Sequence, residues 1–208
     1  MPRPRSALLS LEKITAAALA LVDAEGLAAL STRRLAAALG VSGPSLYNHI
    51  AAKEDLLDAV VEVVTGQVDL SALGTRPWPE ALRHWASSYH AALAAHPNLV
   101  PVAALGPGRR PNALRMADAV YGCLVGAGWP AREATKVGAL MRFFVTGSAL
   151  GSFAGGFPAD PDLYRVRYPH LAHSAHLLAD HRQKVDAGAF ETGLDALIAG
   201  LELRFAAL

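Results

Sequence analysis

The stretch Gly40–Ile50, GVSGPSLYNHI, constrains the fold most strongly, because it places a stop and a sharp turn between two short apolar-patterned segments. Gly40 can adopt the left-handed conformation that ends a helix. Ser42 is a typical N-cap residue, and Pro44 is tolerated in a first helical turn, where its missing N–H has no intrahelical partner. With a helix expected at Arg33–Leu39, the pattern predicts two short helices joined by a tight turn.

Helical signals continue on both sides of this turn. Ser10 is predicted to cap a helix that runs to about Glu25 and is closed by Gly26. Thr32 is predicted to cap the short helix before the turn, and another helix is expected to start near Lys53. The N-terminal part therefore reads as three short helices followed by a connecting helix.

The rest of the chain reads as longer helices rich in alanine, leucine and valine, which favours helix over sheet. Further helices are expected over about 79–96, 111–125, 132–154, 168–182 and 190–207. We therefore predict an all-α protein of two domains. An N-terminal domain, 1–55, would contain a helix-turn-helix at about 32–51, and a larger helical bundle would comprise 56–208.

Composition narrows the class of protein. Hydrophobic residues make up 52% of the 208-residue chain, which suits a folded core. The single cysteine, Cys123, fits a reducing cytoplasm, where we expect the protein to work. The apolar run Val137–Phe157 is long enough to span a membrane, but Arg142 and its glycines favour a buried helix.

Charge is informative through its distribution rather than its total of +1. Between Leu27 and Lys53 the charged residues are Arg33, Arg34 and Lys53, and the acidic residues lie just outside. A local patch of positive charge is what a phosphate-facing surface needs, although a short window can also show one by chance.

A helix-turn-helix places its second helix in the major groove of DNA, with the first helix crossing the backbone. The segment LSTRRLAAALGVSGPSLYNHIAAKEDLLDAV resembles the DNA-binding domain of the tetracycline-repressor (TetR) family. The similarity covers about Ser10–Val64 and follows the family's T-x-R-x-L-A-x-x-L-G-V-x-x-x-x-L-Y-x-H-x-x-x-K-x-x-L-L pattern. The C-terminal FETGLDALIAGLELRF is similar, more weakly, to the last helix of the tetracycline-repressor branch.

The resemblance implies DNA contacts residue by residue. Phosphate contacts are implied for Thr32, Tyr47 and Lys53, and a backbone-facing position for His49. Packing residues are the alternative for Tyr47 and His49. Arg3 and Arg5 would form a basic arm on DNA or remain a disordered terminus. Base-edge or phosphate contacts are implied for Arg33 of the first helix and for four residues of the second: Gly43, Pro44, Ser45 and Asn48.

The family also implies a homodimer on a palindromic operator of double-stranded DNA. Small residues repeating every four positions let helices approach closely, within one subunit or between two. The dimer interface expected from the long helix and the last helix comprises Gly147, Gly151, Gly155, Leu194, Leu197, Ile198, Leu201 and Phe205.

A small-molecule effector pocket is implied in the same half. Each aromatic candidate could instead be ordinary core, and a lone charge in an apolar helix needs a partner, either an acidic ligand or an Asp or Glu of the bundle. The candidate pocket residues are Trp85, Tyr89, Met116, Tyr121, Arg142, Phe143, Phe144 and Phe153.

Family members that bind tetracycline with magnesium carry a histidine before a Leu-Gly pair, where this chain has Ala104. Their second histidine and glutamate correspond to Phe143 and Gly151, so a larger, more apolar inducer is expected. The histidines at 170, 173, 176 and 181 do not converge on one helix face, so neither a metal site nor a cofactor is predicted.

The leading hypothesis is a dimeric repressor released from its operator by a small, largely apolar ligand. A DNA-binding regulator without an inducer, or an activator, is the alternative. A helical enzyme is a remote one, because the chain lacks a Gly-x-Ser-x-Gly elbow, a phosphate loop and a clustered carboxylate pair.

Overall fold

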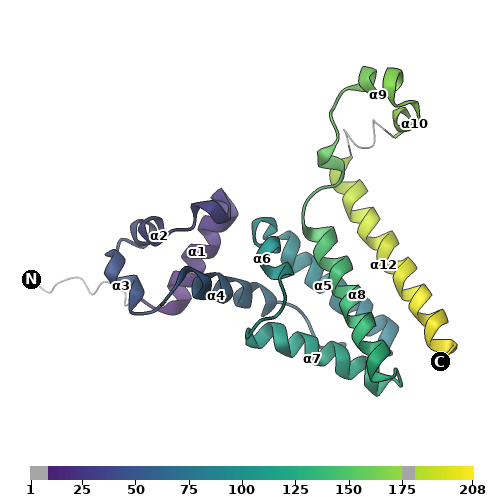
Figure 1. The fold of residues 1–208 in the computed structure, drawn as a ribbon, viewed down its shortest axis with the longest axis horizontal. Coiled ribbons are helices and arrows are strands. Elements are labelled where there is room, and N and C mark those ends of the chain that lie inside the picture. The colour runs from purple at the N-terminus through teal and green to yellow at the C-terminus, as the bar shows by residue number, and fades with distance from the viewer. Residues whose placement is uncertain (1–8, 175–180) are drawn as a thin grey trace, which may run out of the picture. The chain divides into compact units, whose positions relative to one another are not determined.

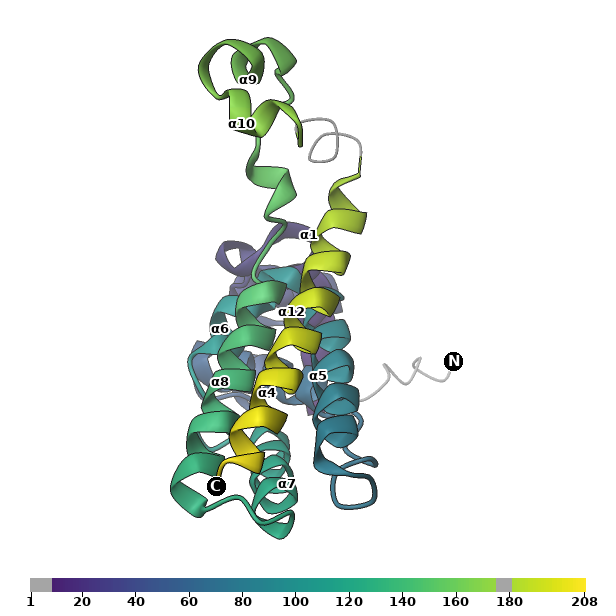
Figure 2. The ribbon, with the colours of Figure 1, turned by 90° about the vertical axis from the view of Figure 1, so that its right-hand side faces the viewer.

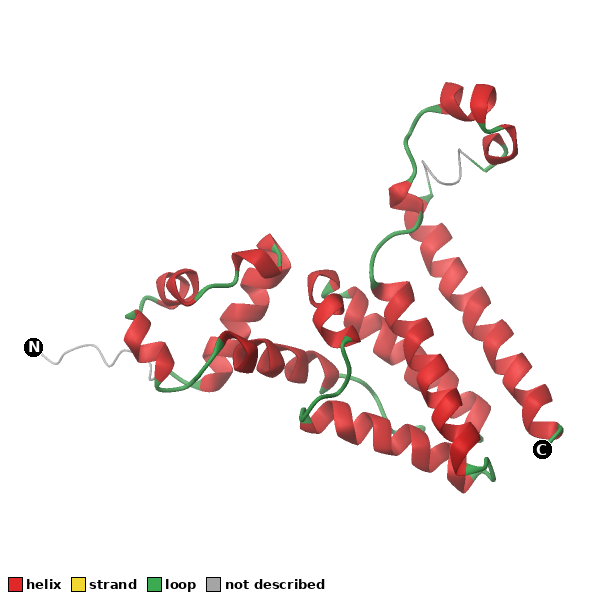
Figure 3. Ribbon diagram, in the orientation of Figure 1, coloured by secondary structure: helices red, strands yellow, loops and turns green. Residues whose placement is uncertain are grey.

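The computed structural model describes residues 9–174 and 181–208, and every regular element within them is a helix (Figures 1 and 3). The all-α prediction is confirmed. No helix in these two ranges is long and apolar enough to cross a membrane. The α-helices are α1 (Leu11–Glu25), α2 (Thr32–Leu39), α3 (Gly43–Tyr47), α4 (Lys53–Thr65), α5 (Trp78–Ala94), α6 (Val100–Ala104), α7 (Pro111–Gly126), α8 (Ala131–Ala149), α9 (Pro161–Arg167), α10 (Pro169–Ala172) and α12 (Arg182–Ala206).

The chain forms two compact units. The first, called the head unit here, comprises the chain up to Val68 together with Ala95–Asp118. The second, the bundle unit, comprises Asp69–Ala94 and Ala119–Leu208. Three short 3₁₀ turns join helices within them: η1 (Leu27–Ala29), η2 (Pro97–Leu99) and η3 (Ala154–Gly156).

Local capping explains where the helices of the head unit begin and end. The Ser10 hydroxyl accepts a hydrogen bond from the Lys13 N–H, and Gly26, at φ +81°, ends α1, as predicted. The cap of α2 is Ser31, whose hydroxyl accepts from the Arg34 N–H, so the predicted cap at Thr32 is wrong by one residue. Consecutive hydroxyl residues offer two competing caps, and here the first one is used.

The predicted turn between α2 and α3 is confirmed. Gly40 has φ +65° and ψ +30°, and its N–H donates to the carbonyls of Ala36 and Ala37. Ser42 occupies the N-cap position of α3, but its hydroxyl bonds to the Ser45 hydroxyl at 2.7 Å instead of to the helix backbone. The turn therefore fixes the Ser45 side chain as well as the direction of α3.

The bundle unit is built around α5, α8 and α12, which run side by side in Figures 1 and 2. At one end, Trp78, Trp129 and Phe205 pack ring against ring at centroid distances of 5.1–5.7 Å. At another, His90 of α5 and Phe144 of α8 stack on Phe190 of α12. Aromatic packing of this kind holds helices together with little need for polar contacts.

Three helix predictions in the bundle unit were wrong in their limits. The long helix ends at Ala149, so Gly151 and Gly155 lie beyond α8 and do not continue a stripe along it. The last helix starts at Arg182 rather than Phe190. In place of the helix expected over 168–182, the described residues show the short α10 and the start of α12, and 175–180 lie outside the described residues.

Candidate nucleic-acid interface and effector half

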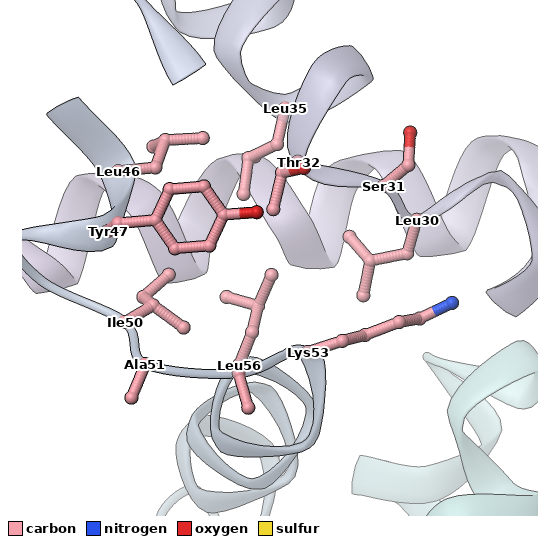
Figure 4. A pocket seen from close by; sticks show the side chains of 11 residues that line it. Leu30, Ser31, Thr32, Leu35, Leu46, Tyr47, Ile50, Ala51, Lys53 and Leu56 are labelled. Atoms are coloured by element: carbon pink, nitrogen blue, oxygen red, sulfur yellow. The ribbon is translucent and has the colours of Figure 1, made fainter. Parts of the chain in front are cut away.

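A pocket of about 410 Å³ lies where α2, α3 and the start of α4 meet in the head unit (Figure 4). Its floor is apolar, since Leu35, Leu46 and Leu56 are each at most 3% exposed. One leucine comes from each of the three helices, so their packing fixes the helices relative to one another.

Polar groups surround this apolar floor. Thr32 of α2, Tyr47 of α3 and Lys53 of α4 all line the pocket and all have exposed side chains. Figure 4 shows the Tyr47 hydroxyl directed toward the α2 side, with Lys53 extending its amine from the start of α4. The three predicted phosphate contacts, which are distant in sequence, are thus brought together around one concave surface.

The remaining predicted DNA-contact residues lie around the same turn. Pro44, Asn48 and His49 are exposed, while Gly43 and Ser45 are half-buried. Tyr47 is 58% exposed, and its role in DNA contact remains a prediction. Arg33, on α2, is also exposed. Arg3 and Arg5 lie outside the described residues.

One member of the predicted basic patch is engaged within the protein. Both terminal nitrogens of Arg34 bond to the carboxylate of Glu25 at 2.6 Å, in a two-point pairing. The patch is therefore reduced to Arg33 and Lys53. Sequence reasoning missed this pairing because Glu25 and Arg34 belong to different helices, and only the fold makes them neighbours.

Asp55 is a second residue that sequence reasoning passed over. Its carboxylate accepts a hydrogen bond from the Ala52 N–H at 3.0 Å, so it caps the start of α4. Asp55 and Glu54 also place negative charge at the helix N-terminus, where the helix dipole favours it. An acidic residue three positions after the cap was the signal that could have revealed it.

A second hollow of about 410 Å³ lies in the bundle unit between α8 and α12. Phe143 and Phe153 line it and are 68% and 69% exposed, which is unusual for aromatic side chains. Phe144, Phe190 and the backbone of Gly147 complete much of its surface. The bundle thus presents an aromatic groove to its surroundings.

The side chain of His90 lies directly behind this groove. Its ring stacks on Phe190 with a centroid distance of 3.9 Å and an interplanar angle of 16°. Burial lowers the pKa of His90 below its ordinary value, and a hydrogen bond with the Ser148 backbone opposes that shift. Burial thus favours the neutral form of the ring, which suits its apolar stacking partner.

Comparison with known proteins identifies the family. Residues 14–60 match the family described as bacterial regulatory proteins, tetR family, and residues 70–205 match the tetracyclin repressor-like C-terminal domain. The second match alone spans more than half of the chain. The chain belongs to the TetR family.

Individual relatives agree with this assignment. The class C tetracycline repressor of Escherichia coli is 32% identical over 207 residues, covering 93% of this chain and 91% of that one. A crystal structure described as a possible TetR family regulator from Streptomyces coelicolor is 33% identical, with a TM-score of 0.79 over 93% of this chain and 99% of that one.

Another solved structure, the TetR-family protein ActR of Streptomyces coelicolor in complex with actinorhodin, is 30% identical, with a TM-score of 0.71 over 95% of this chain and 98% of that one. Members of the family bind DNA operators and small-molecule effectors. This TetR-family chain is accordingly a DNA-binding transcriptional repressor and not an enzyme.

The residues predicted for the effector pocket of this TetR protein fall into distinct environments. Trp85, Tyr89 and Met116 are at most 5% exposed, whereas Phe143 and Phe153 belong to the open groove. Phe144 and Arg142 of α8 are half-buried, as is Tyr121 of α7, whose ring packs against Gly138. Their assignment to a pocket remains a prediction.

The residues predicted for the dimer interface also differ in their burial within the subunit. Leu194, Ile198 and Leu201 of α12 are at most 5% exposed within their own subunit. Gly147 and Gly151 are exposed, and nothing lies within 4 Å of a methyl group built on either of them. The other three members are exposed Gly155 and half-buried Leu197 and Phe205. Their role in dimerisation remains a prediction.

Within the described residues, no group of three or more histidine, cysteine, aspartate or glutamate side chains is placed to hold a metal ion. His170 and His173 are exposed on and beside α10, and His181 is exposed at the start of α12. His176 lies outside the described residues.

Replacing Asp55 by alanine should destabilise the head unit by about 1 kcal/mol more than replacing Glu54 by alanine. Both changes remove one negative charge from the first turn of α4, but only Asp55 accepts the Ala52 N–H. Urea unfolding monitored by circular dichroism measures the difference. Equal losses for Asp55→Ala and Glu54→Ala would show that the cap bond contributes nothing.

Proposed function

We propose that the protein is a homodimeric repressor that binds a palindromic operator and is released from it by a small, largely apolar ligand. The observation that carries the DNA-binding part is the arrangement of Thr32, Tyr47 and Lys53 around one pocket of the head unit. Each comes from a different helix, and each offers a hydrogen-bond donor.

A backbone phosphate is the group that such a rim suits. Hydroxyl and ammonium groups donate to phosphate oxygens, and the apolar floor offers no competing hydrogen-bond acceptor. The pairing of Arg34 with Glu25 removes one positive charge nearby and leaves Lys53 as the charged member of the rim. We assign this pocket to the DNA backbone rather than to the effector.

Sequence reading would come from the start of α3 and from the exposed residues beside it. Asn48 can pair with adenine in the major groove, and Arg33 with guanine. Ser45 is held by its bond to Ser42, so its hydroxyl is positioned before DNA arrives. Gly43 and Pro44 leave space for a thymine methyl group. His49 is assigned to the backbone.

Dimerisation is supported by the apolar surface that α8 and its following loop expose in the bundle unit. Leu140, Phe143, Leu150 and Phe153 are 41–69% exposed, and Leu203 of α12 is 76% exposed. Monomeric proteins rarely expose so many large apolar side chains on neighbouring elements. A second copy related by a two-fold axis would cover this surface with its own equivalent face.

The ligand class is inferred from relatives and from this chain's departures from them. One relative is named a tetracycline repressor, and another is solved in complex with actinorhodin. In this chain Ala104, Phe143 and Gly151 occupy the positions implied for metal-binding side chains. Buried Trp85 and Tyr89 stack at 5.9 Å and offer aromatic faces rather than charged ligands. These features favour an apolar polycyclic effector bound without magnesium.

Release would follow from a population shift. An effector that binds better to one arrangement of the subunits favours that arrangement, and the two recognition helices then lose the spacing of one DNA turn. Only a difference in effector affinity between the two arrangements can produce this effect.

Replacing Lys53 by alanine should weaken binding to the inverted repeat next to the protein's own gene and lower the slope of log affinity against log salt by about 1 per subunit. Tyr47→Phe should weaken binding with little change of slope, because it removes a hydroxyl without a charge. Fluorescence anisotropy at several salt concentrations measures both. Lys184→Ala, which removes an exposed lysine of α12, is the control. An equal loss of affinity in Lys184→Ala would contradict the assignment of Lys53 to a phosphate contact.

Replacing Phe143 by glutamate should lower the free energy of dimer dissociation by about 3–5 kcal/mol, because it leaves unpaired charges buried at the interface. Sedimentation velocity should show a dimer for the wild type and a monomer for Phe143→Glu. Leu11→Glu alters an exposed leucine of α1 and should stay dimeric. A dimeric Phe143→Glu protein, or a monomeric wild type, would refute the proposed interface.

Actinorhodin, used as a polycyclic probe, should lower the affinity for the inverted repeat by about tenfold or more, a typical coupling between effector and DNA. Minocycline with Mg²⁺ should leave it unchanged. Anisotropy titrations of the preformed DNA complex with each probe make the comparison. Release by minocycline only in the presence of Mg²⁺ would contradict the ligand class, and DNA binding insensitive to an apolar polycyclic panel would favour a regulator without an inducer.

A further inference from the structure

The segment that leads into α6 is fastened to the C-terminal end of α1 within the head unit. The side-chain nitrogen of Asn98 donates to the carbonyl oxygens of Val22 and Asp23, at 3.0 and 3.2 Å. His96 Nδ1 lies 2.9 Å from the Asp23 carboxylate. Leu99 is fully buried beside these contacts. This segment is therefore held to α1 by polar bonds and by packing.

The other end of the same segment is fastened to one face of α4. Glu62 accepts a hydrogen bond from the Asn112 N–H, and the Asn112 side chain donates to the Glu62 carbonyl at 3.1 Å. One turn earlier, Asp58 pairs with Arg110 at 3.7 Å. One turn later, Gly66 leaves room for Asn112, since a Cβ there would lie 2.7 Å from its amide nitrogen. Residues spaced by four share a helix face.

Arg110 links the loop before α7 to α4. It is only 6% exposed, and its guanidinium donates to the carbonyls of Gly106 and Pro107 as well as pairing with Asp58. Within the described residues, one of its terminal nitrogens and one oxygen of Glu62 are buried without a hydrogen-bond partner. A buried charge with few partners depends strongly on each one that it has.

We propose that His96–Asn112 is a strap that fixes α4 against α1, and that Arg110 is the positioning residue through which the strap supports DNA binding. The proposal rests on the proposed function for its DNA readout. One guanidinium donates to the loop carbonyls and forms an ion pair with Asp58, so it fixes the loop and α4 relative to each other.

The consequence for DNA binding follows from what α4 carries. Lys53 is the first residue of α4, and Leu56 forms part of the apolar floor of the head pocket. Thr32 and Tyr47 belong to α2 and α3, which pack on each other and, through α2, on α1. A strap from α1 to α4 therefore sets Lys53 relative to the other two rim residues.

Arg110→Met in the full-length chain tests the strap, with Arg109→Met as the matched control. Both changes remove one positive charge from neighbouring positions, but Arg109 is exposed. Arg110→Met should weaken binding to the inverted repeat about tenfold, while Arg109→Met stays within about twofold of the wild type. The salt slope and the fraction of active protein should be unchanged in both, because Arg110 positions Lys53 and does not itself contact a phosphate.

Wild-type affinity in Arg110→Met would overturn the proposal, as would a lowered salt slope, which would make Arg110 a direct phosphate contact. If Arg110→Met does not fold, Asn112→Ala should give the same pattern with a smaller loss, and wild-type affinity there would also overturn it. Failure of the wild type to bind DNA would contradict the proposed function alone. In that case hydrogen exchange tests the strap separately. Faster exchange of the α4 amides in Arg110→Met than in the wild type would support the strap, and unchanged exchange would overturn it.

Discussion

The packing of Leu35, Leu46 and Leu56 into one apolar floor is the interaction on which the head unit depends. Each leucine comes from a different short helix, and helices of this length are marginal in isolation. Their shared burial gives α2, α3 and α4 fixed positions, and those positions bring Thr32 and Tyr47 to the rim beside the start of α4. As the proposed DNA contact, such a rim would be preorganised, so that little ordering would remain when DNA binds.

In the bundle unit, the same helices contribute side chains to the core and also expose an apolar face. On α12, Leu194 and Ile198 are directed into the subunit, whereas Leu203 is open to its surroundings. On α8, Met141 is fully buried and Phe143 is exposed. If one side of a helix packs inside its own subunit and another side packs against a second copy, the helix must be apolar on both sides.

The features that sequence predicted well are those with local causes. The turn at Gly40 and the start of α1 follow from a glycine at positive φ and a serine cap, which involve only neighbouring residues. The errors have non-local or competing causes. Ser31 displaced Thr32 as the cap of α2, and the pairing of Arg34 with Glu25 joins two helices whose contact no local pattern announces.

The central claim is that two head units bind one palindrome through matching backbone contacts. Hydroxyl-radical footprinting of the wild-type protein on the inverted repeat beside its own gene tests it most directly. The account predicts two equivalent protected patches whose centres are about one helical turn of DNA apart, or a whole multiple of it. A single patch, or protection that does not weaken as salt is raised, would contradict it.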